Sequence, residues 1–285
     1  MSPVSVSPAS THKPSRVGQH VLAGFTWLMI IYNMLPIAVM VVFSFNFAPG
    51  GRIALNWQHF TLANYRDAFG IQDLTGAMAH SLEVASGSAL ISCILGTPLA
   101  LALARYRFLG KTPTDLVIFA DIAAPAVVVG ASLLSLFLTL NLPRGLITIF
   151  IAHIAFNVAF AVVVIRARVS GLDRALDRAA ADLGATPWVA FWTVIFPLIL
   201  PGIVGAWLLC FLLSIDDLII TTFVAGQTMT FPLWVYGAVK VGTPPQVFVL
   251  STLVFTGGVA LALINIALAR RRPLDDRRKP SNALV

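Results

Sequence analysis

Long apolar blocks separated by short polar segments are the main feature of the chain. Six blocks are rich enough in apolar residues to be candidate membrane spans, covering residues 21–45, 77–104, 116–140, 146–165, 194–223 and 247–269. A helix needs about 20 mostly apolar residues to cross the hydrocarbon core of a bilayer. The blocks lack the two-residue alternation that is typical of outer-membrane barrels. The pattern therefore predicts an all-α polytopic membrane protein with six transmembrane helices.

A charged segment separates the fourth block from the fifth. Its apolar residues fall on one helix face by their spacing, and they are Leu172, Ala175, Leu176, Ala179 and Leu183. Gly184 follows at the position where a left-handed residue ends many helices. Thr186 and Pro187 then supply an N-cap and a first-turn proline for a second helix. Because the apolar face is mostly alanine, we interpret the segment as a helix-break-helix unit that packs closely against another protein. A helix that merely lies on the lipid surface is the alternative.

Composition and charge agree with a membrane protein. Apolar residues make up 58% and charged residues 11% of the chain, against about 25% charged in an average soluble protein. The net charge is +7, and fifteen of the nineteen basic residues fall within segments 13–16, 105–111, 166–178 and 270–279, on one side of the predicted topology. Basic loops remain in the cytoplasm. Both termini and the charged segment are therefore predicted to be cytoplasmic, and the charge does not indicate a nucleic-acid partner.

The chain divides into one membrane domain and two tails. Residues 1–19 are rich in serine and proline and predict a disordered cytoplasmic tail. Residues 20–272 form the predicted transmembrane domain, and 273–285 a second cytoplasmic tail. Cys93 and Cys210 both fall inside predicted spans, so free buried thiols are expected rather than a disulfide.

The charged segment also carries a resemblance. The stretch "LDRALDRAAADLGATPWVAFWTVIFPLILPGI" resembles the EAA loop of ABC-importer permeases, with Ala179, Ala180, Asp182, Leu183, Gly184, Ala185 and Pro197 in matching positions. In that family the loop forms a coupling helix that sits in a cleft of the ATPase subunit. Arg178 stands where the signature glutamate is usual, and Asp177 lies one position earlier. The resemblance implies an ATPase-coupling site made of Asp177, Arg178, Ala179, Ala180, Asp182, Leu183, Gly184 and Ala185, within a coupling loop at 172–201.

The resemblance extends over residues 20–272 and is closest to the spermidine/putrescine branch. It is carried by ordered pieces that include "NWQHFTLANY", "ARYRFLGK", "AHIAFN", "SIDDLIITTFVAG" and "VKVGTPPQV". It implies a type I ABC-importer permease fold in a bacterial inner membrane. The implied partners are a homodimer of ABC ATPase subunits, a second homologous permease subunit and an extracytoplasmic substrate-binding protein.

Few ionisable residues lie inside the predicted spans, so each is a candidate for handling substrate. They are Glu83, Asp121, His153, Asp216 and Asp217. A charge within hydrocarbon usually faces a cavity or a partner. Asp216 and Asp217 belong to the matched "SIDD" piece, and their side chains are about 100° apart if helical, so both cannot face one path. We predict that at least one lines a path for a cation, together with His153. A structural pair and a satisfied core histidine are the alternatives.

One departure bears on the substrate. The polyamine permeases are expected to have an acidic residue after a proline near the start of the third block, where this chain has Ala126. Another amine, an amino-acid-derived molecule or a zwitterion is therefore an alternative substrate. A self-contained secondary transporter or channel is an alternative of a different class.

Enzymatic motifs are missing from the sequence. It contains no HExxH, GxSxG or CxxC pattern and no P-loop. We expect a non-catalytic membrane subunit that binds no metal and no cofactor. ATP and its magnesium ion would be bound by a separate ATPase subunit.

Overall fold

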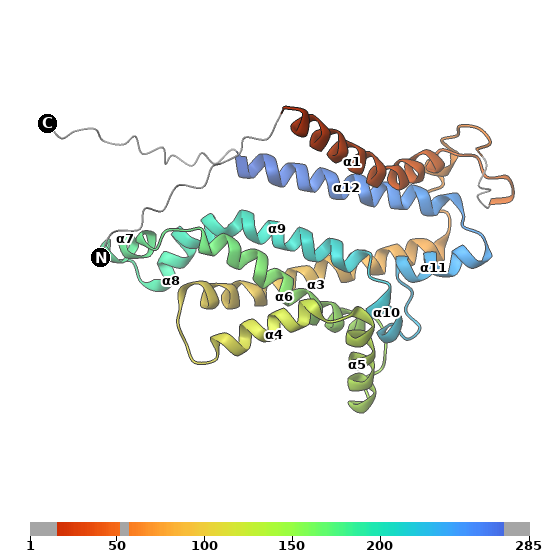
Figure 1. Ribbon diagram of the computed structural model, residues 1–285. Helices are drawn as coiled ribbons and strands as arrows, with labels where there is room; N and C mark the ends of the chain where they lie inside the picture. The colour runs from red at the N-terminus through yellow and green to blue at the C-terminus, as the bar shows by residue number, and fades with distance from the viewer. Residues whose placement is uncertain (1–15, 52–56, 271–285) are drawn as a thin grey trace, which may run out of the picture.

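The computed structural model describes residues 16–51 and 57–270, and within these ranges the chain is helical apart from turns and one isolated bridge between Asn46 and Phe60 (Figure 1). The elements are α1 (Arg16–Ser44), η1 (Pro49–Gly51), α2 (Ala63–Arg66), α3 (Gln72–Arg105), α4 (Lys111–Ala123), α5 (Ala126–Thr139), α6 (Leu146–Ser170), α7 (Ala175–Asp182), α8 (Pro187–Ala190), η2 (Phe191–Ile195), α9 (Phe196–Ile215), α10 (Ile219–Val224), α11 (Phe231–Val241) and α12 (Pro245–Arg270). The predicted tail 273–285 and most of the predicted tail 1–19 lie outside the described residues.

Five of the predicted spans are single helices of sufficient length and hydropathy to cross a bilayer. They are His20–Ser44, Gln72–Arg105, Leu146–Ser170, Pro187–Ile215 and Pro245–Ala267. The predicted third span differs, because α4 and α5 together have the required composition but are bent by 107°. Counted as one broken span, the pair brings the number to six. The prediction of an all-α polytopic membrane protein is confirmed.

A proline explains the bend of the third span. Pro125 lies between α4 and α5, and it has no backbone N–H to continue a helix. Proline also disfavours helical backbone in the residue before it, and Ala124 is extended at ψ 132°. After the break α5 leaves the direction of the bundle and packs against α10 (Figure 1). The prediction of a continuous third helix is therefore wrong in this detail.

The core of the molecule lies where α3, α6 and α9 pack together. Small residues allow this close approach, as in other membrane helix pairs. A Cβ added at Gly96 of α3 would lie 3.1 Å from the Cβ of Ala161 on α6. Cys93 and Cys210 are free and buried in the same cluster, as predicted.

The segments predicted to share the basic side gather at one end of the molecule. Figure 1 shows the start of α1, the connection from α3 to α4, the α7–α8 segment and the end of α12 at this end. The α10–α11 connection and the turn into α12 lie at the other. The helices thus run from a basic end to an end with few basic residues.

Candidate functional site

A break between α9 and α10 holds the two adjacent aspartates. α9 ends at Ile215 and α10 begins at Ile219, so both carboxylates lie on non-helical backbone. Asp217 accepts hydrogen bonds from the backbone N–H groups of Ile220 at 3.3 Å and Thr221 at 2.8 Å. It also accepts the Thr221 hydroxyl at 2.8 Å. Asp217 therefore caps the first turn of α10, whose N–H groups have no partner within the helix.

Four helices are joined around His153, which is 3% exposed. Its Nε2 lies 3.0 Å from the Thr221 Oγ1 and 3.4 Å from a carboxylate oxygen of Asp217. Its Nδ1 contacts the hydroxyl of Ser214 on α9, which lies 3.2 Å from the Ser88 hydroxyl on α3. Both ring nitrogens and both Asp217 oxygens thus have partners. The structure brings the predicted path residues His153 and Asp217 together, but in a buried network that satisfies their own polar atoms.

Asp216 is on the other side of the break, where it lines a cavity. The cavity has a volume of about 760 Å³ and is formed by α1, α3, α9, α11 and α12 and by the α9–α10 break. Its aromatic lining residues are Phe231, Tyr236 and Phe255, and most of the remainder is aliphatic. Asp216 is exposed, whereas the Asp217 side chain is only 12% exposed. Of the three residues predicted to line a path, Asp216 alone lines this cavity.

The chemistry of this cavity suits an amine with an alkyl chain. A carboxylate in apolar surroundings attracts an ammonium group strongly, and aromatic faces add cation–π contacts. The Tyr236 ring already has the Lys240 Nζ 4.6 Å from its centroid. This ring therefore already makes a cation–π contact within the chain, and Phe231 and Phe255 are the other aromatic residues of the lining.

The second candidate region is the predicted coupling segment at the basic end. α7 ends at Asp182, and Gly184 follows with a left-handed φ of 81°. The N–H of Gly184 donates to the Ala181 carbonyl at 2.9 Å, and the N–H of Ala185 donates to the Ala180 carbonyl at 3.0 Å. This pair of hydrogen bonds is the Schellman motif. The predicted helix end at Gly184 is confirmed.

The second half of the segment continues directly into a transmembrane helix. The Thr186 side chain accepts the Val189 N–H, and Pro187 occupies the first turn, as predicted. A π-helical turn, η2, precedes Pro197, and α9 then runs through Pro201 without a break. Pro187–Ile215 is one helix of 29 residues, about 43 Å long at 1.5 Å per residue. This helix begins within the predicted coupling segment and ends at Ile215, directly before Asp216.

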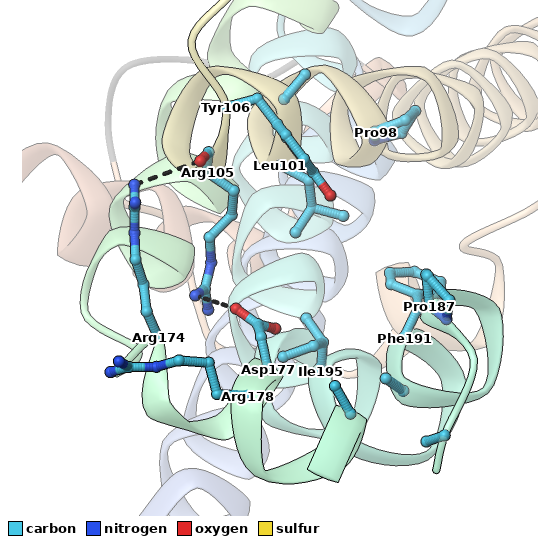
Figure 2. Close-up of a pocket in the computed structure, with 14 residues that line it drawn as sticks. Pro98, Leu101, Arg105, Tyr106, Arg174, Asp177, Arg178, Pro187, Phe191 and Ile195 are labelled. Atoms are coloured by element: carbon cyan, nitrogen blue, oxygen red, sulfur yellow. Dashed lines mark hydrogen bonds and ion pairs between the residues drawn. The ribbon is translucent and has the colours of Figure 1, made fainter.

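The side chains of the coupling segment divide between inward and outward positions. Asp177 forms an ion pair with Arg105 at the end of α3, with 2.6 Å between Arg105 Nη1 and the carboxylate (Figure 2). Ala180 is buried and Ala185 half-buried. Outward positions are taken by Arg178, Ala179, Asp182 and Leu183, with Leu183 89% exposed. Asp177 is therefore engaged within the chain, whereas Leu183 is exposed and Arg178, although exposed, lines a cavity beside Asp177.

Several residues at these sites were missed by sequence reasoning. Ser88, Ser214 and Thr221 complete the network around His153, and Arg105 pairs with Asp177. A signal existed for Thr221, which follows Asp217 at the four-residue spacing of one helical turn. Ser88 and Arg105 are far along the chain from their partners. Their pairing depends on how α3 packs.

Comparisons with known proteins identify relatives over most of the chain. Residues 96–272 match the family model described as "Binding-protein-dependent transport system inner membrane component". The spermidine/putrescine transport system permease protein PotC of Escherichia coli (strain K12) is 34% identical over 255 residues, which are 89% of this chain and 96% of PotC. The putrescine transport system permease protein PotI of the same strain is 36% identical over 241 residues, covering 82% of this chain and 83% of PotI.

Solved structures show the same fold at lower identity. A chain of a bacterial ABC transporter involved in the import of the acidic polysaccharide alginate aligns with a TM-score of 0.60 at 18% identity, covering 92% of this chain and 99% of that chain. A chain of the MetNI methionine ABC transporter aligns with a TM-score of 0.58 at 16% identity, covering 70% and 96%. At these identities the likeness concerns the fold alone.

Proposed function

The chain belongs to the binding-protein-dependent transport system inner membrane component family, and from this premise we propose that it is one of two permease subunits of an ABC importer for polyamines. Its relatives PotC and PotI are named for spermidine/putrescine and putrescine transport. The observation that carries the proposal is the single carboxylate of Asp216 in a cavity with mostly apolar walls. That combination suits a protonated amine followed by methylene groups.

A second permease subunit completes the pathway in this proposal. One carboxylate can neutralise one ammonium group, whereas spermidine and putrescine carry more than one. Ala126 at the start of α5 offers no second charge, and it packs against an apolar cluster. The partner permease is therefore expected to supply the remaining acidic or aromatic groups. An extracytoplasmic binding protein would deliver the amine to the end with few basic residues.

ATP hydrolysis would be linked to this cavity through the helix Pro187–Ile215. We place the coupling loop 172–201 in the cleft of a separate ATPase subunit, where Arg178, Ala179, Asp182 and Leu183 offer an outward face. Closure of an ATPase dimer on ATP and its magnesium ion would displace this loop. Because the helix is continuous, its far end would move the α9–α10 break and with it Asp216. The basic end, including both termini, is then cytoplasmic.

An amine shorter than a polyamine, or a zwitterion, is the second candidate substrate. It is favoured because Ala126 stands where the polyamine permeases are expected to have an acidic residue. A self-contained secondary transporter is disfavoured by the coupling-loop resemblance and by the family to which the chain belongs.

Uptake of labelled amines tests the proposal. The chain is produced with its partner subunits in cells without other polyamine uptake, and labelled spermidine, putrescine and a zwitterionic amino acid are compared. Energised uptake of the polyamines that requires both the ATPase and Asp216 is the expected result. Uptake of the amino acid alone would move the assignment to the second candidate, and uptake without the ATPase would refute the importer.

A further inference from the structure

A second cavity lies at the basic end, between the end of α3 and the segment from α7 to η2 (Figure 2). Its volume is about 910 Å³. One part of its wall is apolar and includes Pro98, Leu101, Pro187 and Phe191. Another part is formed by Arg105, Arg174 and Arg178, with Asp177 as the one acidic lining residue. The cavity is thus mostly apolar, with three arginines in its wall.

The arginine side chains have more donors than the chain itself uses. Arg105 directs Nη1 to Asp177, but its Nη2 is buried without a hydrogen-bond partner. Arg174 donates one N–H to the Arg105 carbonyl at 3.3 Å. A guanidinium has five N–H donors, and a buried donor without a partner is destabilising. Three guanidinium groups against one carboxylate therefore leave an excess of positive charge and an unsatisfied donor.

Neighbouring aromatic residues indicate the depth of the cavity in the membrane. Tyr106, Trp188 and Trp192 are 67%, 70% and 46% exposed. Exposed tyrosine and tryptophan side chains at the end of a span are typical of the headgroup level of a bilayer. Arg105 is the last residue of α3, so a bilayer whose headgroups meet these aromatic side chains would place lipid phosphates near its guanidinium and acyl chains near the apolar wall.

We propose that this cavity binds the headgroup phosphate of an anionic phospholipid, with Arg105 Nη2 and Arg174 as its donors and the wall at Leu101 and Phe191 against the upper acyl chain. Basic pockets between transmembrane helices on the cytoplasmic side suit such headgroups. An acidic side chain of the ATPase is the other candidate occupant. The apolar wall favours the lipid, because a carboxylate from a soluble subunit would leave that wall unfilled. The site goes beyond the proposed transport function and does not depend on the amine.

Lipid retention by the purified permease pair tests the proposal. The pair is reconstituted in nanodiscs with equal parts of phosphatidylcholine and phosphatidylglycerol, released, and its bound lipids are identified by native mass spectrometry. The wild type is expected to retain phosphatidylglycerol selectively. Arg105→Gln and Arg174→Gln should each weaken this retention by about fivefold. Arg174→Gln leaves the Arg105–Asp177 ion pair in place, so its result stands even if Arg105→Gln disturbs folding.

Arg107→Gln is the matched control, because Arg107 is exposed, follows Arg105 by two residues and is absent from the cavity lining. It should change retention by no more than about twofold, as expected for a surface charge. Equal retention of both lipids, or an equal loss in the control, would overturn the proposal. So would displacement of the lipid by inorganic phosphate, which indicates a soluble anion, or by the added ATPase, which indicates a protein carboxylate. Amine uptake is a separate readout, so failure here leaves the transport function standing.

Discussion

The two ends of the helix Pro187–Ile215 each adjoin a break in the chain, and the breaks are held in different ways. At the basic end, backbone hydrogen bonds of the Schellman motif and the left-handed Gly184 turn the chain between α7 and α8. At the other end, side-chain contacts hold the α9–α10 break: Asp217 of the break bonds to Thr221 on α10 and lies beside His153 on α6, which contacts Ser214 on α9.

This difference indicates different mechanical roles. The break at Gly184 depends on a glycine because the backbone there is left-handed. It lies at the surface, and a Cβ at this position would have no neighbour within 4 Å. In the proposed mechanism it would transmit the movement of the ATPase without repacking a core. The α9–α10 break is bonded to α6 and, through Ser214, to α3, so Asp216 would move together with these helices rather than alone. Each prediction below tests one side of this comparison.

Gly184→Val should have the largest effect. A non-glycine residue in left-handed backbone costs roughly 1–2 kcal/mol, and a β-branched side chain there is a genuine outlier. The break should rearrange, abolishing uptake while the protein still inserts in the membrane. Gly184→Asn is the control, because asparagine tolerates this conformation. Energised uptake and membrane abundance are measured together, and normal uptake by the valine variant would remove the coupling role.

Asp216→Asn should lower polyamine uptake by about tenfold to a hundredfold. The reason is loss of a charge-assisted hydrogen bond, worth about 1.5–3 kcal/mol, to the ammonium group. Asp216→Glu should keep part of the activity, since it keeps the charge. Association with the ATPase, measured by co-purification, should not change. An unaltered uptake rate in the asparagine variant would exclude Asp216 from the path.

Asp217→Asn should act mainly on stability. An amide cannot accept all the hydrogen bonds that this carboxylate receives from α10, and it loses the charge beside His153. A loss of about 1–3 kcal/mol is expected, measured as a lower thermal unfolding midpoint in detergent. Asp216→Asn is the matched control and should leave the midpoint unchanged. If both variants unfold at the same temperature as the wild type, the two aspartates do not differ in the way described.

Asp177→Asn should have the smallest effect. Its ion pair with Arg105 joins α7 to α3, but the Asp177 side chain is 47% exposed, and such pairs contribute about 1 kcal/mol or less. Uptake should fall by no more than about fivefold. The exchange Arg105→Asp with Asp177→Arg should recover part of the loss. Asp73→Asn, at an exposed position at the opposite end of α3 from Arg105, serves as the control and should behave as the wild type.

The membrane spans and the ends of the helices in the predicted coupling segment could be predicted from sequence, because both depend on local properties of the chain. The length of each apolar block matches the thickness of the bilayer. Thr186 caps the helix that follows it, and Gly184 ends the helix before it by its left-handed backbone, so both act on residues close by in the chain. The bend at Pro125 was less evident, because a proline in a membrane helix can be tolerated or can end the helix. Which outcome occurs depends on what the following segment packs against, and here α5 packs against α10.

The amino-acid sequence by itself determined that this protein is a polytopic helical membrane protein, that its basic segments share one side, and that a helix-break-helix unit precedes the fifth span. These properties follow from local hydropathy, charge and backbone preference. Only the tertiary structure decided that Asp216 lines the cavity. It also decided that the polar atoms of Asp217 and His153 are bonded to each other and to neighbouring residues in a buried network. The two aspartates are chemically identical and adjacent in the chain. Their different roles come from the neighbours that α6, α10 and α11 place around each of them.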